Sequence, residues 1–226
     1  MFHKMLIKEV EVKNGAVFVT DVHYKKEDEK FLNLLKNFIK NPPPQIFFLG
    51  DIFHLLLPFE FLYEYNKSAI ELINELSAKT EIYYIYGNHD FCIDEFFPKI
   101  NFADAFVDKK NSIYLSHGDL DTENLFYRLY SFFIRNRFTL NFLNFITFNF
   151  INNYLFKKLL NKKIKCNYHI SNIQINKPFK HVIIGHYHNF KIINNVLILS
   201  SFYCSKNYYI IQIDKKINFK EINYGR

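Results

Sequence analysis

Five short apolar runs, each followed at once by Asp, Asn or His residues, limit the possible folds of this chain more than any other feature. The runs occupy residues 16–20, 45–49, 81–86, 112–116 and 181–184. The polar side chains that follow them are Asp21, His23, Asp51, Asn88, His89, His117, His186 and His188. In open α/β sheets, ligand-binding groups gather outside the carboxyl ends of the strands. We therefore expect these side chains to meet although they lie far apart in the sequence.

Helical patterns separate the apolar runs. In residues 26–40, the apolar side chains Phe31, Leu34, Leu35 and Phe38 have the spacing of one helix face. Similar patterns predict helices over 61–78 and 125–160, and β-rich patterns predict strands over 191–199 and 207–213. Alternation of strands and helices followed by a β-rich end is typical of a layered α/β fold. A length of 226 residues suits one domain, 1–226, with an insertion.

The residue types at the strand ends indicate a metal site. Carboxylate, imidazole and amide groups make a mixed nitrogen and oxygen donor set, which suits Mn²⁺, Fe or Zn²⁺ better than a thiolate site would. Asp51 has two carboxylate oxygens, so it could bridge two ions. Two ions held about 3.5–4 Å apart can activate water and clamp the oxygens of a phosphoryl group. The pattern therefore predicts metal-dependent phosphoryl chemistry.

The order of the motifs D-x-H, G-D, G-N-H-D, H-G-D and G-H-x-H resembles that of the calcineurin-like metallophosphoesterase superfamily. The resemblance runs from Asp21 to His188. It implies a sandwich of two sheets flanked by helices and a pair of divalent ions. We expect Mn²⁺, with Fe, Zn²⁺ or Mg²⁺ as the other candidates.

The same resemblance implies a role for each residue of the motifs. One ion takes Asp21, His23, Asp51 and His188. The other ion takes Asp51, Asn88, His117 and His186. His89 lies outside the metal ligands and faces the leaving group, so Asp51 and His89 are the implied catalytic residues.

A finer resemblance, to the bacterial UDP-2,3-diacylglucosamine hydrolases of lipid A synthesis, rests on residues 87–91 and on the stretch after His117. That family splits a pyrophosphate to release UMP and a diacylglucosamine 1-phosphate, and a helical lid precedes its G-H-x-H motif. Residues 121–175 stand in the place of the lid, and His89 stands where the family usually has Arg. The implied substrate contacts are Asn88, Thr122, Asn124, Tyr127, Arg128, Arg135 and Arg137.

The composition of the predicted lid agrees with a lipid substrate. Residues 121–180 contain ten Lys or Arg and two acids, whereas residues 138–156 contain no charge and five Asn. An apolar groove suits acyl chains, and cations at its rim suit a diphosphate or anionic headgroups. A structural helical hairpin with a solvated face is the alternative, and the Asn content argues against a membrane span. We expect a cytoplasmic protein, because the N-terminus has no long apolar core. The apolar and basic lid leads us to expect peripheral association with the inner membrane.

The cysteines and one further histidine lead to weaker expectations. Cys92, Cys166 and Cys204 are odd in number and widely spaced, without a C-x-x-C motif. This argues against disulfides and for a reducing compartment. His54 follows Asp51 closely enough to approach the site, but a position just outside the metal ligands or at the surface is the simpler interpretation.

Two other functions remain open. One is a metal-dependent phosphatase, phosphodiesterase or nuclease that acts on a soluble or nucleic-acid substrate. Nucleic acid is an unlikely partner, because nucleic-acid grooves interleave single aromatic side chains with cations and do not need a long charge-free Phe run. The other is a non-catalytic membrane-surface protein, against which the complete set of metal ligands argues.

Overall fold

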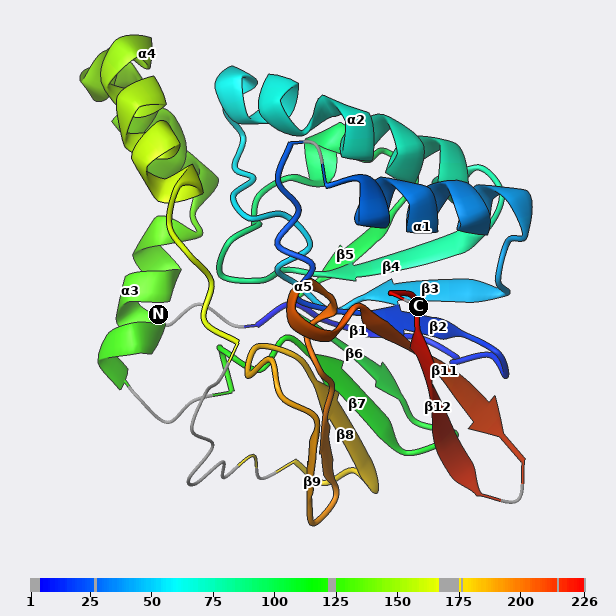
Figure 1. The fold of residues 1–226 in the computed structure, drawn as a ribbon. Helices are drawn as coiled ribbons and strands as arrows, with labels where there is room; N and C mark the ends of the chain where they lie inside the picture. Colours follow the sequence, from blue (N-terminus) through cyan, green and yellow to red (C-terminus); the bar gives the residue numbers. More distant parts are fainter. Residues whose placement is uncertain are drawn as a thin grey trace.

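The protein consists of two six-stranded sheets with helices beside them, as predicted (Figure 1). The computed structural model describes residues 5–26, 28–121, 125–166, 175, 177–214 and 216–225. All elements and contacts below refer to this part of the chain.

The first sheet has the strand order β1-β6-β7-β8-β10-β9. Its strands are β1 (Ile7–Glu9), β6 (Ala105–Asp108), β7 (Ile113–Ser116), β8 (His181–Ile184), β10 (Val196–Ile198) and β9 (Lys191–Ile193). Strands β7, β8 and β10 are parallel neighbours, so their carboxyl ends lie at one edge. The predicted strand over 191–199 is in fact the hairpin β9–β10, because the chain turns at Asn194, where φ is +53°.

The second sheet has the strand order β12-β11-β2-β3-β4-β5. Its strands are β12 (Ile217–Asn223), β11 (Asn207–Ile213), β2 (Val17–Val19), β3 (Gln45–Phe48), β4 (Glu81–Ile85) and β5 (Asn101–Ala103). Strands β2 to β5 run parallel to one another, whereas β11 is antiparallel to β2. The β1, β5, β6 and β12 strands were not expected from the sequence.

The core has two main layers. Between the sheets, Phe18, Phe47, Phe106 and their apolar neighbours are fully buried, and the rings of Phe47 and Phe106 from opposite sheets lie 6.5 Å apart. On the outer face of the second sheet pack α1 (Glu29–Lys40) and α2 (Glu60–Ser77) (Figure 1). The Asp28 side chain caps α1 by accepting from the Phe31 amide. The four apolar residues predicted to form one face of this helix are all buried.

Two helices, α3 (Leu125–Ile134) and α4 (Arg137–Leu160), stand beside the sheets (Figure 1). The helical character predicted over 125–160 is confirmed, but it is divided between two helices, because the chain breaks at Arg135 and Asn136. The Asn136 side chain accepts from the Phe138 amide at 2.8 Å and so caps α4 at the break. None of the described helices combines the length and apolar character needed to cross a membrane. We call α3, α4 and the segment 161–166 the lid.

The cysteines correct an expectation from the sequence. Cys166, after α4, forms a disulfide with Cys204 in the short helix α5 (Phe202–Ser205), and Cys92 is a free thiol. The sequence does not reveal the pair, because its partners are 38 positions apart and only the fold brings Cys166 beside α5. The remaining element is a 3₁₀ turn, η1 (Asp94–Phe96).

Candidate metal centre

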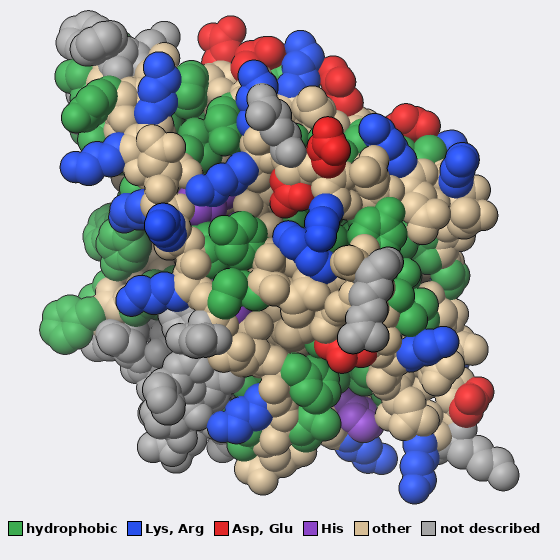
Figure 2. Space-filling view, in the orientation of Figure 1, with side chains coloured by type: hydrophobic (Ala, Val, Ile, Leu, Met, Phe, Trp, Pro, Cys, Tyr) green, Lys and Arg blue, Asp and Glu red, His purple; other side chains and the backbone are tan. Residues whose placement is uncertain are grey.

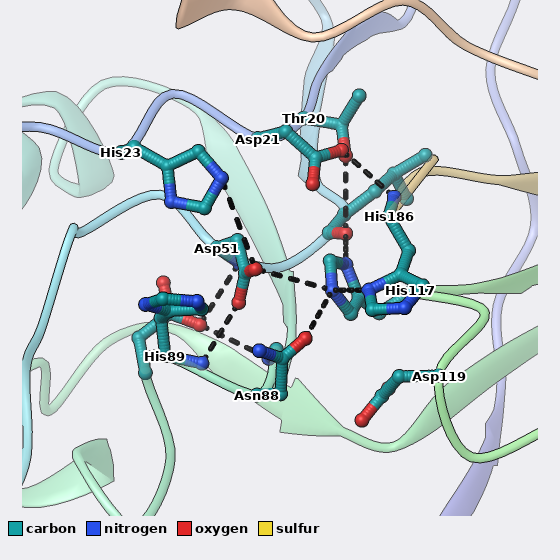
Figure 3. Close-up of polar contacts among 12 residues, drawn as sticks. Thr20, Asp21, His23, Asp51, Asn88, His89, His117, Asp119 and His186 are labelled. Atoms are coloured by element: carbon teal, nitrogen blue, oxygen red, sulfur yellow. Dashed lines mark hydrogen bonds and ion pairs between the residues drawn. The ribbon is translucent and has the colours of Figure 1, made fainter. Parts of the chain in front are cut away.

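The ends of five strands from both sheets meet at one place, as the motifs predicted (Figure 3). The loops after β2, β3 and β4 come from the second sheet, and those after β7 and β8 come from the first. In Figure 3, Asp51 lies centrally, with His23 and His89 on one side and His117 on the other. Every predicted ligand lies in this cluster.

The backbone of the cluster is held in an uncommon conformation. Asp21, His23, Asp51, His186 and His188 all have φ between 46° and 68°. Non-glycine residues rarely adopt this left-handed region, and such residues concentrate at functional sites, where the surroundings hold them. Gly50 has φ +83°, and a Cβ there would lie 2.6 Å from Nδ1 of His117. The loops are thus shaped to bring the ligating side chains together.

The first group of possible ligands is Asp21, His23 and His188, whose ligating atoms lie within 4.8 Å of one another. Nε2 of His188 lies 3.3 Å from Oδ1 of Asp21 and 3.1 Å from Nε2 of His23. Among the described residues, Asp21 Oδ1 is buried without a hydrogen-bond partner. Two imidazole nitrogens and a carboxylate oxygen without a hydrogen-bond partner in the described part of the chain thus converge here. This set of donor atoms fits a divalent cation.

The second group is Asp51, His117 and His186, and Asn88 lies beside it. Nε2 of His117 lies 3.5 Å from Oδ2 of Asp51 and 3.3 Å from Oδ1 of Asn88. Nδ1 of His117 donates to the Leu49 carbonyl at 2.8 Å. This bond leaves the Nε2 lone pair for a metal, an arrangement common in metal-ligating histidines.

Asp51 lies between the two groups, because its Oδ2 is 4.0 Å from Nε2 of His23 and 3.5 Å from Nε2 of His117. Burial acts to raise its pKa, but the neighbouring His117 and His89 rings hold that pKa well below its usual range. Asp51 is therefore a carboxylate, as a bridging ligand must be. The buried Asp and His groups are consistent with a dinuclear metal site.

The histidines differ in charge. Burial lowers the pKa of His23 to about 3, so this ring is neutral and ready to bind a cation. Burial also acts to lower the pKa of His117, but the Asp51 carboxylate outweighs it and raises the pKa to about 10. In the metal-free protein, the His117 proton balances the charge of the Asp51 carboxylate, and a metal ion bound at this place would replace that proton.

His89 lies against the same cluster. Its amide donates to Oδ1 of Asp51 at 2.9 Å, and its Nδ1 donates to the His54 carbonyl at 2.7 Å. Its ligating nitrogen also falls within 4.8 Å of those of His23 and Asp51. His89 is therefore close enough to the centre for its predicted role, which remains a prediction. His54 is 2% exposed and does approach the site.

Asp90 connects two of the loops. Its carboxylate accepts from the amides of Asp51 at 3.0 Å, Ile52 at 2.6 Å and Phe53 at 3.0 Å, and from the Tyr84 hydroxyl. Burial, followed by the charge of Asp51, raises its pKa to about 7. Asp90 thus orients the backbone that carries the predicted ligand Asp51.

A cavity of about 230 Å³ opens beside Asn88 and His89, between the metal centre and the lid. The core contributes Leu55, Leu57 and Phe91, and the lid contributes Tyr127, Tyr130, Ile134 and Leu159. The sequence did not single out most of these side chains, because the walls come from separate segments. The lining is mainly apolar, with Arg135 and Lys162 as its cationic members.

The structure places the predicted substrate contacts in different parts of the molecule. Tyr127 and Arg135 line the cavity, and both bind the buried carboxylate of Asp119, the hydroxyl of Tyr127 at 2.8 Å. Arg137 lies elsewhere, paired at the surface with Asp94 and Glu95. Thr122, Asn124 and the side chain of Arg128 lie outside the described residues.

Residues 16–190 match the family model of the calcineurin-like phosphoesterases, and the chain belongs to this family. With its buried Asp and His groups, it is a metal-dependent phosphohydrolase. The family assignment agrees with the two-sheet architecture.

Several curated relatives are UDP-2,3-diacylglucosamine hydrolases. That of Wigglesworthia glossinidia brevipalpis is 28% identical over 115 residues, which are 46% of this chain and 46% of the relative. That of Coxiella burnetii (strain Dugway 5J108-111) is 26% identical over 126 residues, 50% of this chain and 52% of the relative. The matches thus span about half the length of these relatives. Among solved structures, the phosphoesterase Yfce of E. coli is 15% identical, with 93% of this chain and 99% of that chain covered at a TM-score of 0.45.

Proposed function

We propose that this phosphohydrolase cleaves the pyrophosphate of UDP-2,3-diacylglucosamine to UMP and 2,3-diacylglucosamine 1-phosphate in lipid A synthesis, with two Mn²⁺ ions. The observation that carries the proposal is the apolar cavity between the metal centre and the lid. An apolar wall beside the predicted metal ligands suits a substrate with a lipid portion. The curated relatives, which carry the name of this activity, support the same substrate.

The residues around the cavity suit the two ends of such a substrate. Aliphatic and aromatic walls accept an acyl chain, and each buried methylene contributes about 0.8 kcal/mol. Arg135 is almost fully buried, and its Nη1 has no hydrogen-bond partner among the described residues. A buried guanidinium with a spare donor is suited to a diphosphate oxygen. Residues 121–175 would then form the substrate-binding lid.

Hydrolysis needs a nucleophile, charge neutralisation and a proton for the leaving oxygen. Bound metal ions supply a water of lowered pKa and a Lewis acid for the phosphoryl oxygens. Asp51 holds the two halves of the centre together, and the Asn88 amide lies where it can bind both metal and substrate. His89 is anchored through Nδ1 to the His54 carbonyl, which leaves Nε2 to hydrogen-bond or protonate the leaving oxygen.

The lid surface fits a peripheral position on an anionic bilayer, where the lipid substrate resides. Large apolar side chains of α3 and α4 are exposed, among them Phe126, Phe133, Phe138, Phe142, Phe145 and Tyr154. Exposed Lys157, Lys158 and Lys163 lie at the end of α4 and after it. Figure 2 shows hydrophobic and basic side chains mixed over the region that Figure 1 assigns to these helices. Aromatic groups beside cations are typical of interfacial binding.

The test compares three substrates: UDP-2,3-diacylglucosamine in mixed micelles, a chromogenic phosphodiester and single-stranded nucleic acid. We expect UMP release with a kcat/KM at least about 10² above that for the chromogenic substrate, because binding the lipid portion contributes to catalysis. Hydrolysis confined to the soluble substrates would overturn the lipid assignment and favour a general phosphodiesterase.

A pair of lid variants sharpens this test. Ile134→Ser changes the wall of the cavity, whereas Phe145→Ser changes a side chain that is 82% exposed. We expect Ile134→Ser to raise KM for the lipid and to leave the chromogenic rate unchanged. Phe145→Ser should also leave the chromogenic rate unchanged, and should change KM for the lipid only by weakening adsorption to the micelle surface. Equal losses on both substrates would mean that the cavity wall is only structural.

A further inference from the structure

The disulfide lies between the lid and the metal centre, next to a carbonyl that accepts a hydrogen bond from His188. Cys166 ends the described part of the lid, and Cys204 belongs to α5. We propose that the Cys166–Cys204 disulfide is a redox latch that holds the Lys165 carbonyl against His188, so that its reduction weakens the metal site of Asp21, His23 and His188. This inference goes beyond the proposed substrate, because it concerns how the centre is assembled.

The Cys204 end of the disulfide is tied to the loops that carry the ligands. The Ser201 amide donates to the His188 carbonyl at 3.0 Å, and the Ser201 hydroxyl donates to the Asp21 carbonyl at 2.7 Å. The Tyr203 amide donates to the same Asp21 carbonyl at 3.1 Å. Helix α5 is thus part of the scaffold of the first ligand group, and whatever is bonded to Cys204 is held beside it.

The Cys166 end of the disulfide places a carbonyl on a ligand. Nδ1 of His188 donates to the Lys165 carbonyl at 2.6 Å, and Lys165 directly precedes Cys166. This bond turns Nε2 of His188 toward Asp21 and His23. Such partners of a ligating histidine set its tautomer and orientation, and losing one typically weakens metal binding about 10- to 100-fold.

The second ligand group is anchored differently. His117 donates from Nδ1 to the Leu49 carbonyl, which directly follows β3 in the body of the second sheet. This carbonyl is far from the lid in sequence and does not depend on the disulfide. Reduction should therefore weaken one site and spare the other, which distinguishes a latch from general destabilisation.

Breaking the disulfide would free the end of the lid. Another bond of this segment to the core runs from the exposed Lys25 ammonium to the Lys162 carbonyl at 3.2 Å. An exposed hydrogen bond of this kind contributes little, whereas each residue released gains about 1–2 kcal/mol of conformational entropy. Leu159 and Lys162 also line the cavity, so the latch reaches the proposed substrate site.

The redox step is a thiol–disulfide exchange with a dithiol. A thiolate of the dithiol attacks one sulfur of the disulfide and forms a mixed disulfide, and the second thiol of the reductant then displaces the cysteine. Two electrons and two protons pass to Cys166 and Cys204, and the dithiol becomes a cyclic disulfide. Oxidation by a disulfide-bearing partner reverses the exchange.

The experiment titrates metal-free protein with Mn²⁺ in both redox states by calorimetry. Wild type is reduced with dithiothreitol, freed of reductant under anaerobic conditions, and checked by thiol titration, which should rise from the free Cys92 to all 3 cysteines. We expect one Mn²⁺ to bind about 10- to 100-fold more weakly after reduction, and the other to bind unchanged. Cys166→Ser and Cys204→Ser should show the weak affinity in both states.

Cys92→Ser is the matched control, because Cys92 is outside the disulfide, and it should respond to reduction like wild type. Circular dichroism establishes that each variant is folded, and reduced wild type supplies the same test without a substitution. Equal Mn²⁺ affinities in the two redox states, or three titratable thiols in the folded protein before reduction, would overturn the proposal. Both results are read without substrate, so they leave the assay of UMP release independent.

Discussion

At the residue scale, the chemistry depends on a few side chains whose charge is set by their neighbours. Asp51 touches both ligand groups, and its carboxylate charge raises the pKa of His117 and adds to the burial that raises the pKa of Asp90. The Asp90 carboxyl group in turn binds the Asp51 amide. Three predictions concern Asp51 and the histidines beside it.

Replacing the central carboxylate should remove the centre. Asp51→Asn is expected to leave less than about 1% of wild-type turnover and to lower bound metal, because a neutral amide cannot bridge two cations. Metal content is measured by plasma mass spectrometry alongside the rate. Glu64→Gln, at a 56% exposed surface side chain, is the control and should change neither. Turnover above a few per cent with full metal content would contradict a two-metal mechanism.

His89 should affect the rate and leave the metal in place. We expect His89→Ala to lower kcat by about 10²–10⁴, the usual contribution of a positioned acid or base. His89→Arg separates two roles, since an arginine supplies a positive charge but cannot transfer a proton. Retained activity in His89→Arg would assign His89 to charge stabilisation, and equal loss in both variants would assign it to proton transfer. Loss of metal in His89→Ala would mean that His89 is a ligand.

Metal binding should release a proton from His117. In the metal-free protein, its pKa of about 10 keeps the ring protonated at neutral pH, and the proton must leave when Nε2 binds a cation. Affinity at the second ligand group should therefore rise about tenfold per pH unit between pH 7 and 9, and level off above the pKa. Calorimetry in buffers of different ionisation enthalpy counts the proton. A pH-independent affinity would show that His117 is already neutral.

At the element scale, the break between α3 and α4 determines how the lid meets the core. Arg135 lies at the break and pairs with Asp119, and the two side chains are 6% and 2% exposed. Burial acts to raise the pKa of Asp119, but the Arg135 guanidinium lowers it. Since Asp119 belongs to the H-G-D motif, this ion pair joins the lid to the loop of the predicted ligand His117.

The buried pair and its surface neighbour should differ in their effect on stability. Arg135→Ala leaves the Asp119 charge buried and is expected to cost about 3–5 kcal/mol of unfolding free energy. Arg137→Ala breaks a pair that is 44% and 50% exposed, and should cost about 0–1 kcal/mol. Urea unfolding of the two variants measures the difference. Similar small losses would mean that the lid is not docked through Arg135.

At the scale of the whole molecule, charge is concentrated on the lid. The chain has a formal net charge of +7, and all of this excess belongs to the segment that contains α3 and α4. Such a distribution orients a protein on an anionic surface as well as attracting it. The exposed aromatic side chains of the lid lie on the same helices.

Association with anionic vesicles should depend on this end of the molecule. We expect Lys157, Lys158 and Lys163 changed together to Gln to weaken binding by at most about 1 kcal/mol per charge, and salt to have the same effect. The matched control changes the exposed Lys36, Lys40 and Lys220, which lie on α1 and β12, and should bind almost as wild type. Vesicle sedimentation gives the measurement. Equal losses of vesicle binding in the two triple variants would mean that the net charge attracts the protein to the membrane without orienting it.

The fold class and the meeting of the Asp, Asn and His side chains could be predicted from the sequence, because each of these side chains follows an apolar run. Strand and ligand are then neighbours in the chain, and the parallel order of strands brings their ends together wherever the sheets form. The helix face of α1 and the strands β8 and β11 were predicted for the same local reason.

Contacts between segments that are distant in the sequence were decided by the tertiary structure alone. The Cys166–Cys204 disulfide, the Arg135–Asp119 pair and the walls of the cavity each join residues with no shared periodicity. The break between α3 and α4 also depends on packing, because Arg135 lies at the break and pairs with a buried carboxylate. Local patterns record the preferences of one segment, whereas these contacts depend on which segments the fold brings together.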